Sequence, residues 1–292
     1  MVKVYVDHHF MIGHAHLTNG KPCQDYSLSG VYGESAFAIV SDGCSSGGHT
    51  DVGARILALS TAEAIKKHLA FGGEISEKEA IEKINLWQRA ALSGARTILG
   101  LERKDMLATC LYACVGENGG YASIQGDGVV AVKDIYGNIF MSRVEWADNV
   151  PFYPAYLDDG LDGFITAHGG DLNAKRVMRE DFRKMRSGLE IEITKEEMLL
   201  REGIRGISLF FDRSKIKDID FIALFSDGIG QIDGMGWKEA VYEFMAFKNF
   251  AGEFAKRRMI RAVKDARKTG RGPVDDISFA VIRFERENGP SE

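Results

Sequence analysis

A chain of 292 residues, of which 45% are hydrophobic and 27% charged, has an ordinary globular composition and is long enough to bury a sizeable core. Its net charge of −5 argues against a dedicated nucleic-acid binder, because such domains usually carry a clear positive excess. No apolar run approaches the roughly 18 residues that span a bilayer, so we expect no membrane insertion.

The N-terminal residues and the cysteines favour a cytoplasmic location. The first ten residues contain a single lysine and no long apolar stretch, which disfavours a secretory signal. The cysteines (Cys23, Cys44, Cys110 and Cys114) form no Cys-x-x-Cys pair. Cys110 and Cys114 lie in an apolar run, where buried reduced thiols are expected.

The first half of the chain predicts strands, two long helices and then an antiparallel meander. Strand patterns lie at 1–7, 24–32 and 36–42. A helix from about residue 50 then has its apolar positions on one side, at Val52, Ile56, Leu59 and Ile65. A second helix opens at a capping box, residues 76–79, and runs to about 98. The meander strands, separated by glycine turns, are expected at 107–115, 120–125, 128–133 and 138–145.

The second half contains the segment that is hardest to interpret, residues 146–206. We interpret it as a surface insertion with short helices near 173–186 and 195–202. A strand at 219–226, helices at 236–247 and 250–268, and a strand at 277–284 follow. Because helices occur in pairs without regular βαβ alternation, the pattern favours an α+β fold in one domain, residues 1–292.

Acidic residues mark the ends of several predicted strands. Asp42-Gly43, Asp127-Gly128 and Asp227-Gly228 each follow a strand-like run, and Asp275-Asp276 leads into the last strand. A single Asp-Gly pair is usually a turn. Several carboxylates gathered at one rim would repel each other unless a cation lay between them, and oxygen ligands suit Mg²⁺ or Mn²⁺. The sequence therefore predicts a divalent metal site.

Six short motifs, in order, resemble the metal-dependent Ser/Thr protein phosphatases of type 2C, in their bacterial form. They are Pro22-Cys23-Gln24-Asp25, Val40-Ser41-Asp42-Gly43, Leu107-Ala108-Thr109, Gly126-Asp127-Gly128, Leu224-Phe225-Ser226-Asp227-Gly228 and Asp275-Asp276-Ile277-Ser278. The resemblance implies a β-sandwich of two antiparallel sheets flanked by pairs of helices, with four layers in the order αββα.

The resemblance also implies the roles of individual residues. Asp42 would bridge two metal ions, and the Gly43 carbonyl would bind one of them. Asp227 and Asp275 would complete the shell of the other ion, and Asp25 would contact a metal-bound water. In addition, Asp127 would support a third, weaker ion together with Asp227.

The activity implied is hydrolysis of phosphoserine and phosphothreonine in proteins by a water that bridges two Mn²⁺ or Mg²⁺ ions, with Asp42, Asp227 and Asp275 as the catalytic ligands. The partner would be a phosphorylated protein, and the enzyme would oppose a Ser/Thr kinase.

Three positions depart from the family pattern. Cys44 stands where many members have a histidine proposed to protonate the leaving group, and a packed spectator thiol is the expected reading. Gly20 replaces the phosphate-binding arginine, so Lys21 becomes a candidate for that role, with His16 or Arg55 as further candidates. Gln24 stands where some members have a glutamate ligand, which predicts a second metal held more loosely, through water.

Other functions are open. A catalytically silent relative, used for binding or regulation, is favoured by Gly20 and Cys44. The segment Gly43-Cys44-Ser45-Ser46-Gly47 fits a nucleophile elbow, but the last histidine of the chain is His168, too early for that fold. The pair His14-Ala-His16 could ligate Zn²⁺, although no third ligand follows at short spacing.

Overall fold

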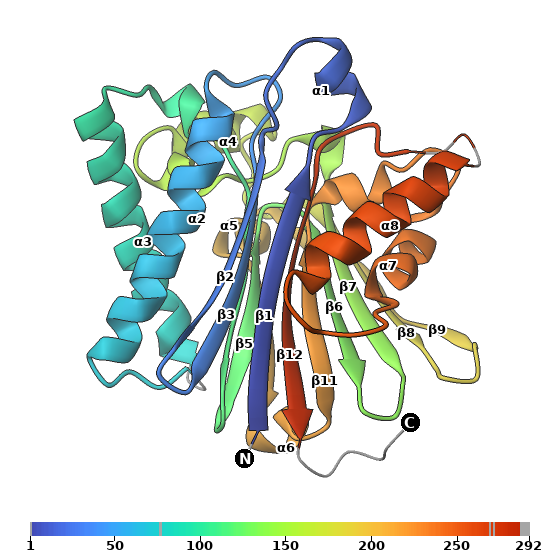
Figure 1. The fold of residues 1–292 in the computed structure, drawn as a ribbon. Helices are drawn as coiled ribbons and strands as arrows, with labels where there is room; N and C mark the ends of the chain where they lie inside the picture. The colour runs from blue at the N-terminus through green and yellow to red at the C-terminus, as the bar shows by residue number, and fades with distance from the viewer. Residues whose placement is uncertain (1, 76–77, 269, 271, 287–292) are drawn as a thin grey trace.

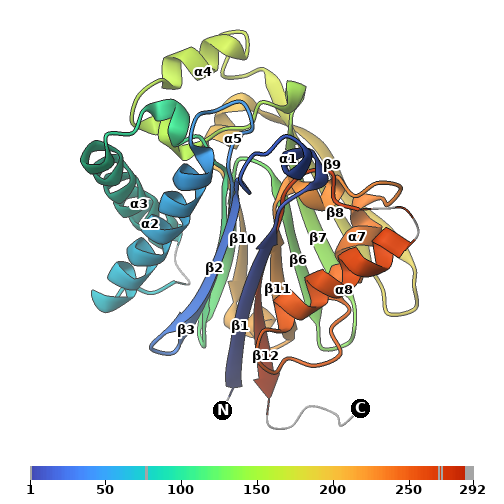
Figure 2. The same ribbon diagram turned by 45° about the horizontal axis from the view of Figure 1, so that its top comes forward.

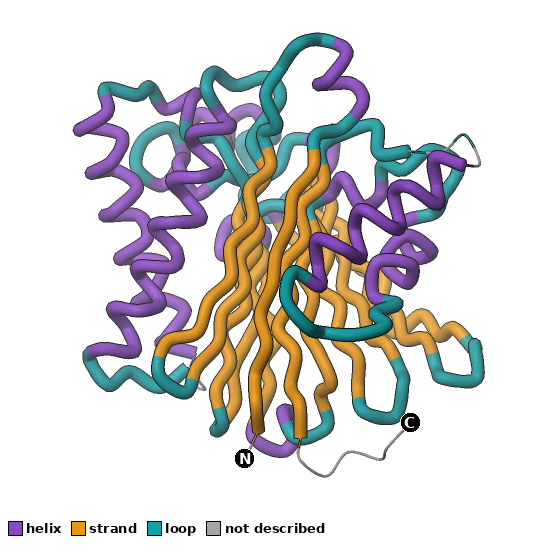
Figure 3. Tube along the Cα trace, viewed as in Figure 1, coloured by secondary structure: helices purple, strands orange, loops and turns teal. Residues whose placement is uncertain are grey.

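Two antiparallel β-sheets lie face to face, with helices on both outer faces (Figure 1). The computed structural model describes residues 2–75, 78–268, 270 and 272–286. Figure 3 shows the same arrangement by element type, with the strands in the middle and the helices outside. The predicted class, an α+β sandwich with four αββα layers, is confirmed. Residues 76–77 of the expected capping box lie outside the described residues.

The larger sheet has seven strands and joins the first strand of the chain to the last. Every neighbouring pair in it is antiparallel. In spatial order the strands are β1 (Val2–Met11), β12 (Ile277–Arg286), β11 (Ile219–Phe225), β6 (Gly128–Asp134), β7 (Ile139–Trp146), β8 (Lys175–Lys184) and β9 (Glu190–Leu199).

The smaller sheet has five strands and is also antiparallel throughout. In spatial order the strands are β10 (Ile207–Asp212), β5 (Gly119–Gln125), β4 (Cys110–Gly116), β3 (Ser35–Asp42) and β2 (Asp25–Tyr32).

Each outer face is covered by one pair of helices. The first pair, α2 (Thr50–Ala70) and α3 (Lys78–Leu99), packs on the five-stranded sheet, and the second, α7 (Trp237–Met245) and α8 (Phe254–Lys268), packs on the seven-stranded sheet. The shorter helices are α1 (His14–Thr18), α4 (Leu161–Ala167), α5 (Leu200–Arg205) and α6 (Arg213–Ile216). None of the described helices combines the length and the apolar character needed to cross a bilayer.

The central strands are apolar at successive positions because both of their faces are covered. In β3, Ala38 and Val40 contribute to the core between the sheets, while Phe37 and Ile39 pack against the α2/α3 layer. This double burial explains why the sequence shows a continuous apolar run there instead of an alternating pattern.

The segment 146–206 differs from its prediction. Residues 173–186 and 195–202 do not form the expected helices: β8 and β9 form a hairpin that extends the seven-stranded sheet, and α5 begins only at Leu200. Parts of the segment also enter the interior, since Phe152 and Phe164 belong to the core between the sheets. That the segment is an insertion into a single domain stays a prediction.

The buried face of α2 also differs from the predicted one. Val52 and Leu59 are exposed, whereas small residues such as Gly53 and Ala58 face the interior. A side chain at Gly53 would place its Cβ 2.0 Å from the Asp105 carbonyl oxygen. Close approach of the helix backbone to the neighbouring chain therefore decides which face of α2 is buried.

Candidate metal and phosphate site

Two acidic residues mark the same end of the five-stranded sheet. Asp25 opens β2 and Asp42 closes β3, and the two residues are direct cross-strand neighbours. This end of the sandwich is the one at which α1 and α4 lie (Figure 2). Asp42 is anchored by Thr109, whose amide donates to the Asp42 carbonyl at 2.8 Å. The two carboxylates are thus held side by side by the register of β2 and β3.

The seven-stranded sheet brings further acids to that end. Asp227 follows β11 at the start of a 3₁₀ helix, Asp227–Gly230, and Asp275 lies two residues before β12. Asp127 lies in the crossing from β5 to β6, where the chain passes from one sheet to the other. Five carboxylates from distant parts of the sequence therefore gather where the two sheets end.

Glycine is required beside two of these acids. A Cβ on Gly43 would lie 2.6 Å from the Thr50 carbonyl oxygen. Gly128 has a φ of +131°, and a Cβ there would lie 2.6 Å from the Phe225 carbonyl oxygen. The Asp-Gly pairs thus reflect crowding of the backbone at the rim.

The carboxylates disfavour each other's charge. Burial, followed by the charges of Asp25 and Asp227, raises the pKa of Asp42 well above its usual value. Burial and the Asp227 charge likewise raise the pKa of Asp127, although Arg143 opposes this shift. The pKa of Asp275 is also raised, by burial first and by the Asp227 charge next. The side chains around these carboxylates supply too little positive charge to balance their negative charge.

The unsatisfied atoms fit a divalent cation. One oxygen of Asp25, Oδ2, accepts a hydrogen bond from Ser226 Oγ at 2.6 Å. The other oxygen, Oδ1, is buried and has no hydrogen-bond partner among the described residues. Carboxylate oxygens of this kind are the ligands that Mg²⁺ and Mn²⁺ prefer. The donor set therefore suits the cations implied by the resemblance.

Gln231 links two of the acids. Its Nε2 donates to Asp227 Oδ2 at 3.0 Å and to Asp275 Oδ2 at 3.4 Å. The side chain therefore holds these two carboxylates facing the same point. Its position four residues after Asp227 carries no sequence signal, and sequence reasoning missed it.

A cleft of ≈ 650 Å³ adjoins the acidic group. Asp127, Asp227 and Gln231 line one part, and charged side chains of β7, β8 and β9 line the rest. Among them, Arg143 lies 5.2 Å over the ring of Trp237 and pairs with Glu145. A guanidinium beside an acidic centre was not foreseen from sequence, because Arg143 sits in an ordinary strand pattern.

None of the residues predicted to bind phosphate lines this cleft. Lys21 is exposed and donates to the Ser45 carbonyl at 3.1 Å. His16 is buried and hydrogen-bonded to Asp276. Their phosphate-binding role stays a prediction.

Cys44 and Gln24, the other two departures from the family pattern, both contact neighbouring side chains. Cys44 Sγ lies 3.2 Å from Ser46 Oγ and contacts the Tyr153 hydroxyl, so its surroundings include the segment 146–206. Burial and the nearby Cys44 thiol raise the pKa of Tyr153. Gln24 is buried, and its Nε2 donates to Thr50 Oγ1 at 2.6 Å.

The structure does not support the nucleophile elbow or the zinc pair as alternative sites. Both ring nitrogens of His168 face carbonyl oxygens, those of Phe164 at 3.0 Å and Val150 at 3.2 Å, so the ring has a structural environment. His14 is exposed and lies next to Thr18, unlike the buried His16. The two residues of the possible zinc pair therefore have different surroundings.

Known phosphatases resemble the chain in sequence and in fold. Residues 12–153 match the family model "Protein phosphatase 2C". No curated protein sequence matches the chain. The fold resembles the serine/threonine phosphatase Stp1 from Staphylococcus aureus, with a TM-score of 0.56, 13% identity, and coverage of 97% of this chain and 96% of that one.

Two further structures have similar folds. A bacterial serine phosphatase aligns with a TM-score of 0.53 and 12% identity, over 98% of this chain and 100% of that one. The catalytic domain of the serine/threonine phosphatase PstP, in complex with two manganese ions, aligns with a TM-score of 0.50 and 15% identity, over 98% of this chain and 100% of that one.

The architecture first defines a class, the αββα sandwich proteins with acidic residues at one end of the two sheets. Within that class, the expected resemblance is confirmed: residues 12–153 match the type 2C protein phosphatase model, and the fold is like that of bacterial phosphatases.

Proposed function

We propose that the chain is a Mn²⁺- or Mg²⁺-dependent phosphatase that acts on phosphoserine and phosphothreonine in proteins. The observation that carries the proposal is the meeting of Asp25, Asp42, Asp127, Asp227 and Asp275 at one rim, with raised pKa values where the shifts are resolved. The match of residues 12–153 to the type 2C phosphatase model supports the reaction class. The two manganese ions of the PstP structure support the choice of metal.

The proposed cation ligands are those that the resemblance to the type 2C phosphatases implies, and the placement of the acids supports them. Asp42 and the Gly43 carbonyl would serve one ion, and Asp42, Asp227 and Asp275 the other. Asp25 would act through water, and Asp127 with Asp227 would hold a third, weaker ion. Bound divalent ions would lower the pKa of a water molecule and neutralise phosphoryl oxygens.

The chain's own groups prepare this centre. The Ser226 hydroxyl fixes one oxygen of Asp25, which leaves the other free to receive a water proton. Gln231 keeps Asp227 and Asp275 convergent. Such fixed ligands need little rearrangement when a phosphate ester arrives, which is the usual origin of electrostatic catalysis.

Arg143 is proposed to contact the phosphate group, in place of the family arginine whose position holds Gly20. Its guanidinium lies near the 3₁₀ helix that carries Asp227. A Cβ added to Gly230 in that helix would lie 3.5 Å from Arg143 Nη2. Its charge acts on Asp127. A planar guanidinium suits phosphoryl oxygens, and the ring of Trp237 restricts its movement. Lys21, which donates to the carbonyl of Ser45 next to Cys44, remains a second candidate for the contact with phosphate.

The test is hydrolysis of p-nitrophenyl phosphate and of a phosphothreonine peptide, with Mn²⁺ and with chelator. Asp42→Ala and Asp227→Ala should lower kcat by at least about a hundredfold, because each removes a ligand that acts in the transition state. The matched control is Asp220→Ala, on β11 but paired with Arg283 at 3.5 Å, which should retain activity. Equal rates for the parent and Asp42→Ala would defeat the proposal.

A catalytically silent member of the family is the second candidate. The observations that favour it are Gly20, which carries no side chain, and Cys44, which contacts Tyr153. It predicts that Mn²⁺ binds without phosphate release from either substrate. The same assay therefore separates the two functions.

The cellular setting is also proposed. All four cysteines are free thiols, which fits a reducing compartment and supports the cytoplasm. The substrate would be a phosphoprotein made by a Ser/Thr kinase.

A further inference from the structure

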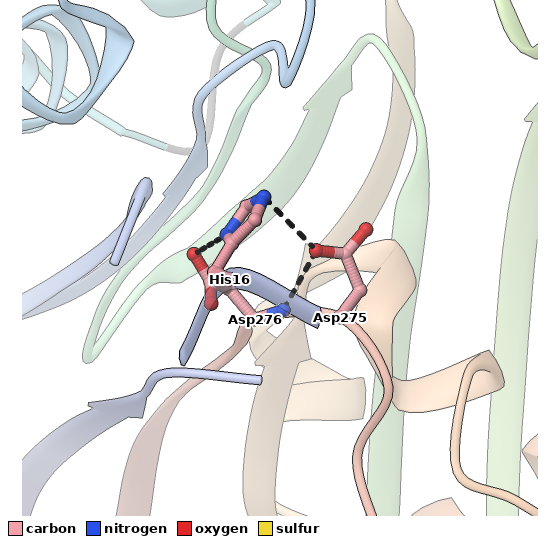
Figure 4. Close-up of side chains that lie close together, drawn as sticks. All are labelled: His16, Asp275 and Asp276. Carbon is pink, nitrogen blue, oxygen red and sulfur yellow. Dashed lines mark hydrogen bonds and ion pairs between the residues drawn. The ribbon is translucent and has the colours of Figure 1, made fainter. Parts of the chain in front are cut away.

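His16 is buried between two carboxylates. The residue is 6% exposed, and its Nδ1 lies 2.8 Å from Asp276 Oδ2. On the other side of the ring, Nε2 faces Asp275 Oδ1 at 4.0 Å. Figure 4 shows the imidazole between the two carboxylates. Among the described residues, these three side chains form a group whose potential metal-binding atoms all lie within 4.8 Å of one another.

Asp276 determines which ring nitrogen of His16 carries the proton. Its Oδ1 accepts from the Gly13 amide at 2.7 Å, and its Oδ2 accepts from the Gln24 amide at 2.6 Å as well as facing His16. Asp276 is 3% exposed, and backbone N–H donors face both of its oxygens, so it accepts the hydrogen bond that it shares with His16. The proton of a neutral imidazole therefore belongs on Nδ1, and Nε2 carries a lone pair.

That lone pair has no hydrogen-bond partner in the part of the chain that the structure describes. The distance of 4.0 Å from Nε2 to Asp275 Oδ1 exceeds hydrogen-bond range. Asp275 Oδ1 in turn accepts from the Asp276 amide, at 2.8 Å. Two electron-rich atoms thus face each other across a gap. Ligand atoms that each lie about 2.0–2.3 Å from one ion are separated by up to about 4–4.5 Å.

We infer that His16 Nε2 is a nitrogen ligand of the cation that Asp275 binds. A metal-bound histidine usually donates its other ring N–H to a carboxylate, and Asp276 fills that position. The inferred centre differs from an all-oxygen one, because an imidazole ligand favours a transition metal such as Mn²⁺ over Mg²⁺. The inference rests on the cation centre proposed above, but not on its catalytic activity.

The decisive measurement is pulsed electron paramagnetic resonance of the Mn²⁺-loaded protein. We expect modulation from an imidazole ¹⁴N bonded to Mn²⁺, which is replaced by a ¹⁵N pattern when the protein is made with ¹⁵N-histidine. A Mn²⁺-loaded protein without any nitrogen coupling would overturn the inference and leave the proposed phosphatase standing. Absence of Mn²⁺ binding, measured by calorimetry, would overturn both.

Two substitutions separate ligation from structure. His16→Asn keeps a donor near Nδ1 for Asp276 and removes Nε2, so the nitrogen coupling should vanish and the Kd for Mn²⁺ should rise at least about tenfold. His16→Gln places an amide near Nε2 and should lose the coupling while shifting preference toward Mg²⁺. The control is His14→Asn, two residues away and exposed, which should retain both the coupling and the affinity. An unchanged spectrum in folded His16→Asn would refute the assignment.

Discussion

Asp25 provides a direct test of whether the acidic centre is built for a cation. It is 3% exposed, with one oxygen bonded to Ser226 and the other without a partner among the described residues. Burial raises its pKa from 3.8 to about 7, although the Ser226 hydrogen bond opposes the shift. The ionised form is therefore disfavoured in the metal-free protein, and Asp25→Asn should remove that cost.

The direction in which the stability changes with pH follows from the proton that Asp25 binds. Between pH 4 and 7, approximately, folded Asp25 holds a proton that the unfolded chain has released, so stability falls as pH rises through this window. Each pKa unit corresponds to 1.36 kcal/mol, which sets a ceiling of ~4 kcal/mol for the gain of Asp25→Asn at pH 8. At pH 5 the ceiling falls below ~2 kcal/mol.

The assay is denaturant unfolding with chelator at pH 5 and pH 8, repeated with Mn²⁺. Asp25→Asn should be the more stable protein without metal, by an amount that grows with pH, and should gain less stability from Mn²⁺. The reasoning fails if the metal-free variant is less stable than the parent at pH 8, or if its gain does not depend on pH.

Asp181→Asn is the matched control for this experiment. Asp181 is another buried aspartate, 4% exposed, but it pairs with Arg179 at 2.7 Å and accepts from Ser142 at 2.6 Å. Its replacement removes the close carboxylate partner of Arg179, which keeps only Glu196 at 3.9 Å, so it should destabilise the protein by about 1–3 kcal/mol at pH 8, with or without Mn²⁺.

Two further predictions concern the departures from the family pattern. Cys44→Ser should change kcat by less than about tenfold, because the thiol contacts Ser46 and Tyr153 as a packed group; complete loss of turnover would show that it takes part in the reaction. Arg143→Ala should raise KM for p-nitrophenyl phosphate and the inhibition constant for inorganic phosphate by about tenfold or more, with partial recovery in Arg143→Lys. An unchanged inhibition constant would exclude contact between Arg143 and phosphate.

The layers of the fold could be predicted because the central strands and the helix pairs have strong local patterns. The hairpin β8–β9 could not. Its strands are rich in Lys, Arg and Glu, which favour helices in isolation, and pairing with β7 overrides that preference. Most of β9 is exposed, so no buried alternation marked it as a strand.

The acids of the site could be located because each one lies at the end of a strand or within two residues of it. The hydrogen bonds that hold these acids in place could not be predicted, because they join residues far apart in the chain. Asp276 contacts His16, Gly13 and Gln24 in the folded chain, where β12 pairs with β1, and no local sequence pattern predicts these contacts. The contact between His16 and Asp276 was therefore not expected, and the phosphate-binding role of His16 stays a prediction.

The position of β12 has a consequence for synthesis on the ribosome. This strand lies between β1 and β11, and the acids Asp275 and Asp276 immediately precede it. A nascent chain that has not yet released β12 leaves β1 without its sheet neighbour and the rim without those two carboxylates. Binding of the proposed metal ions is therefore coupled to synthesis and release of β12, and products truncated before β12 should be inert and open to proteolysis.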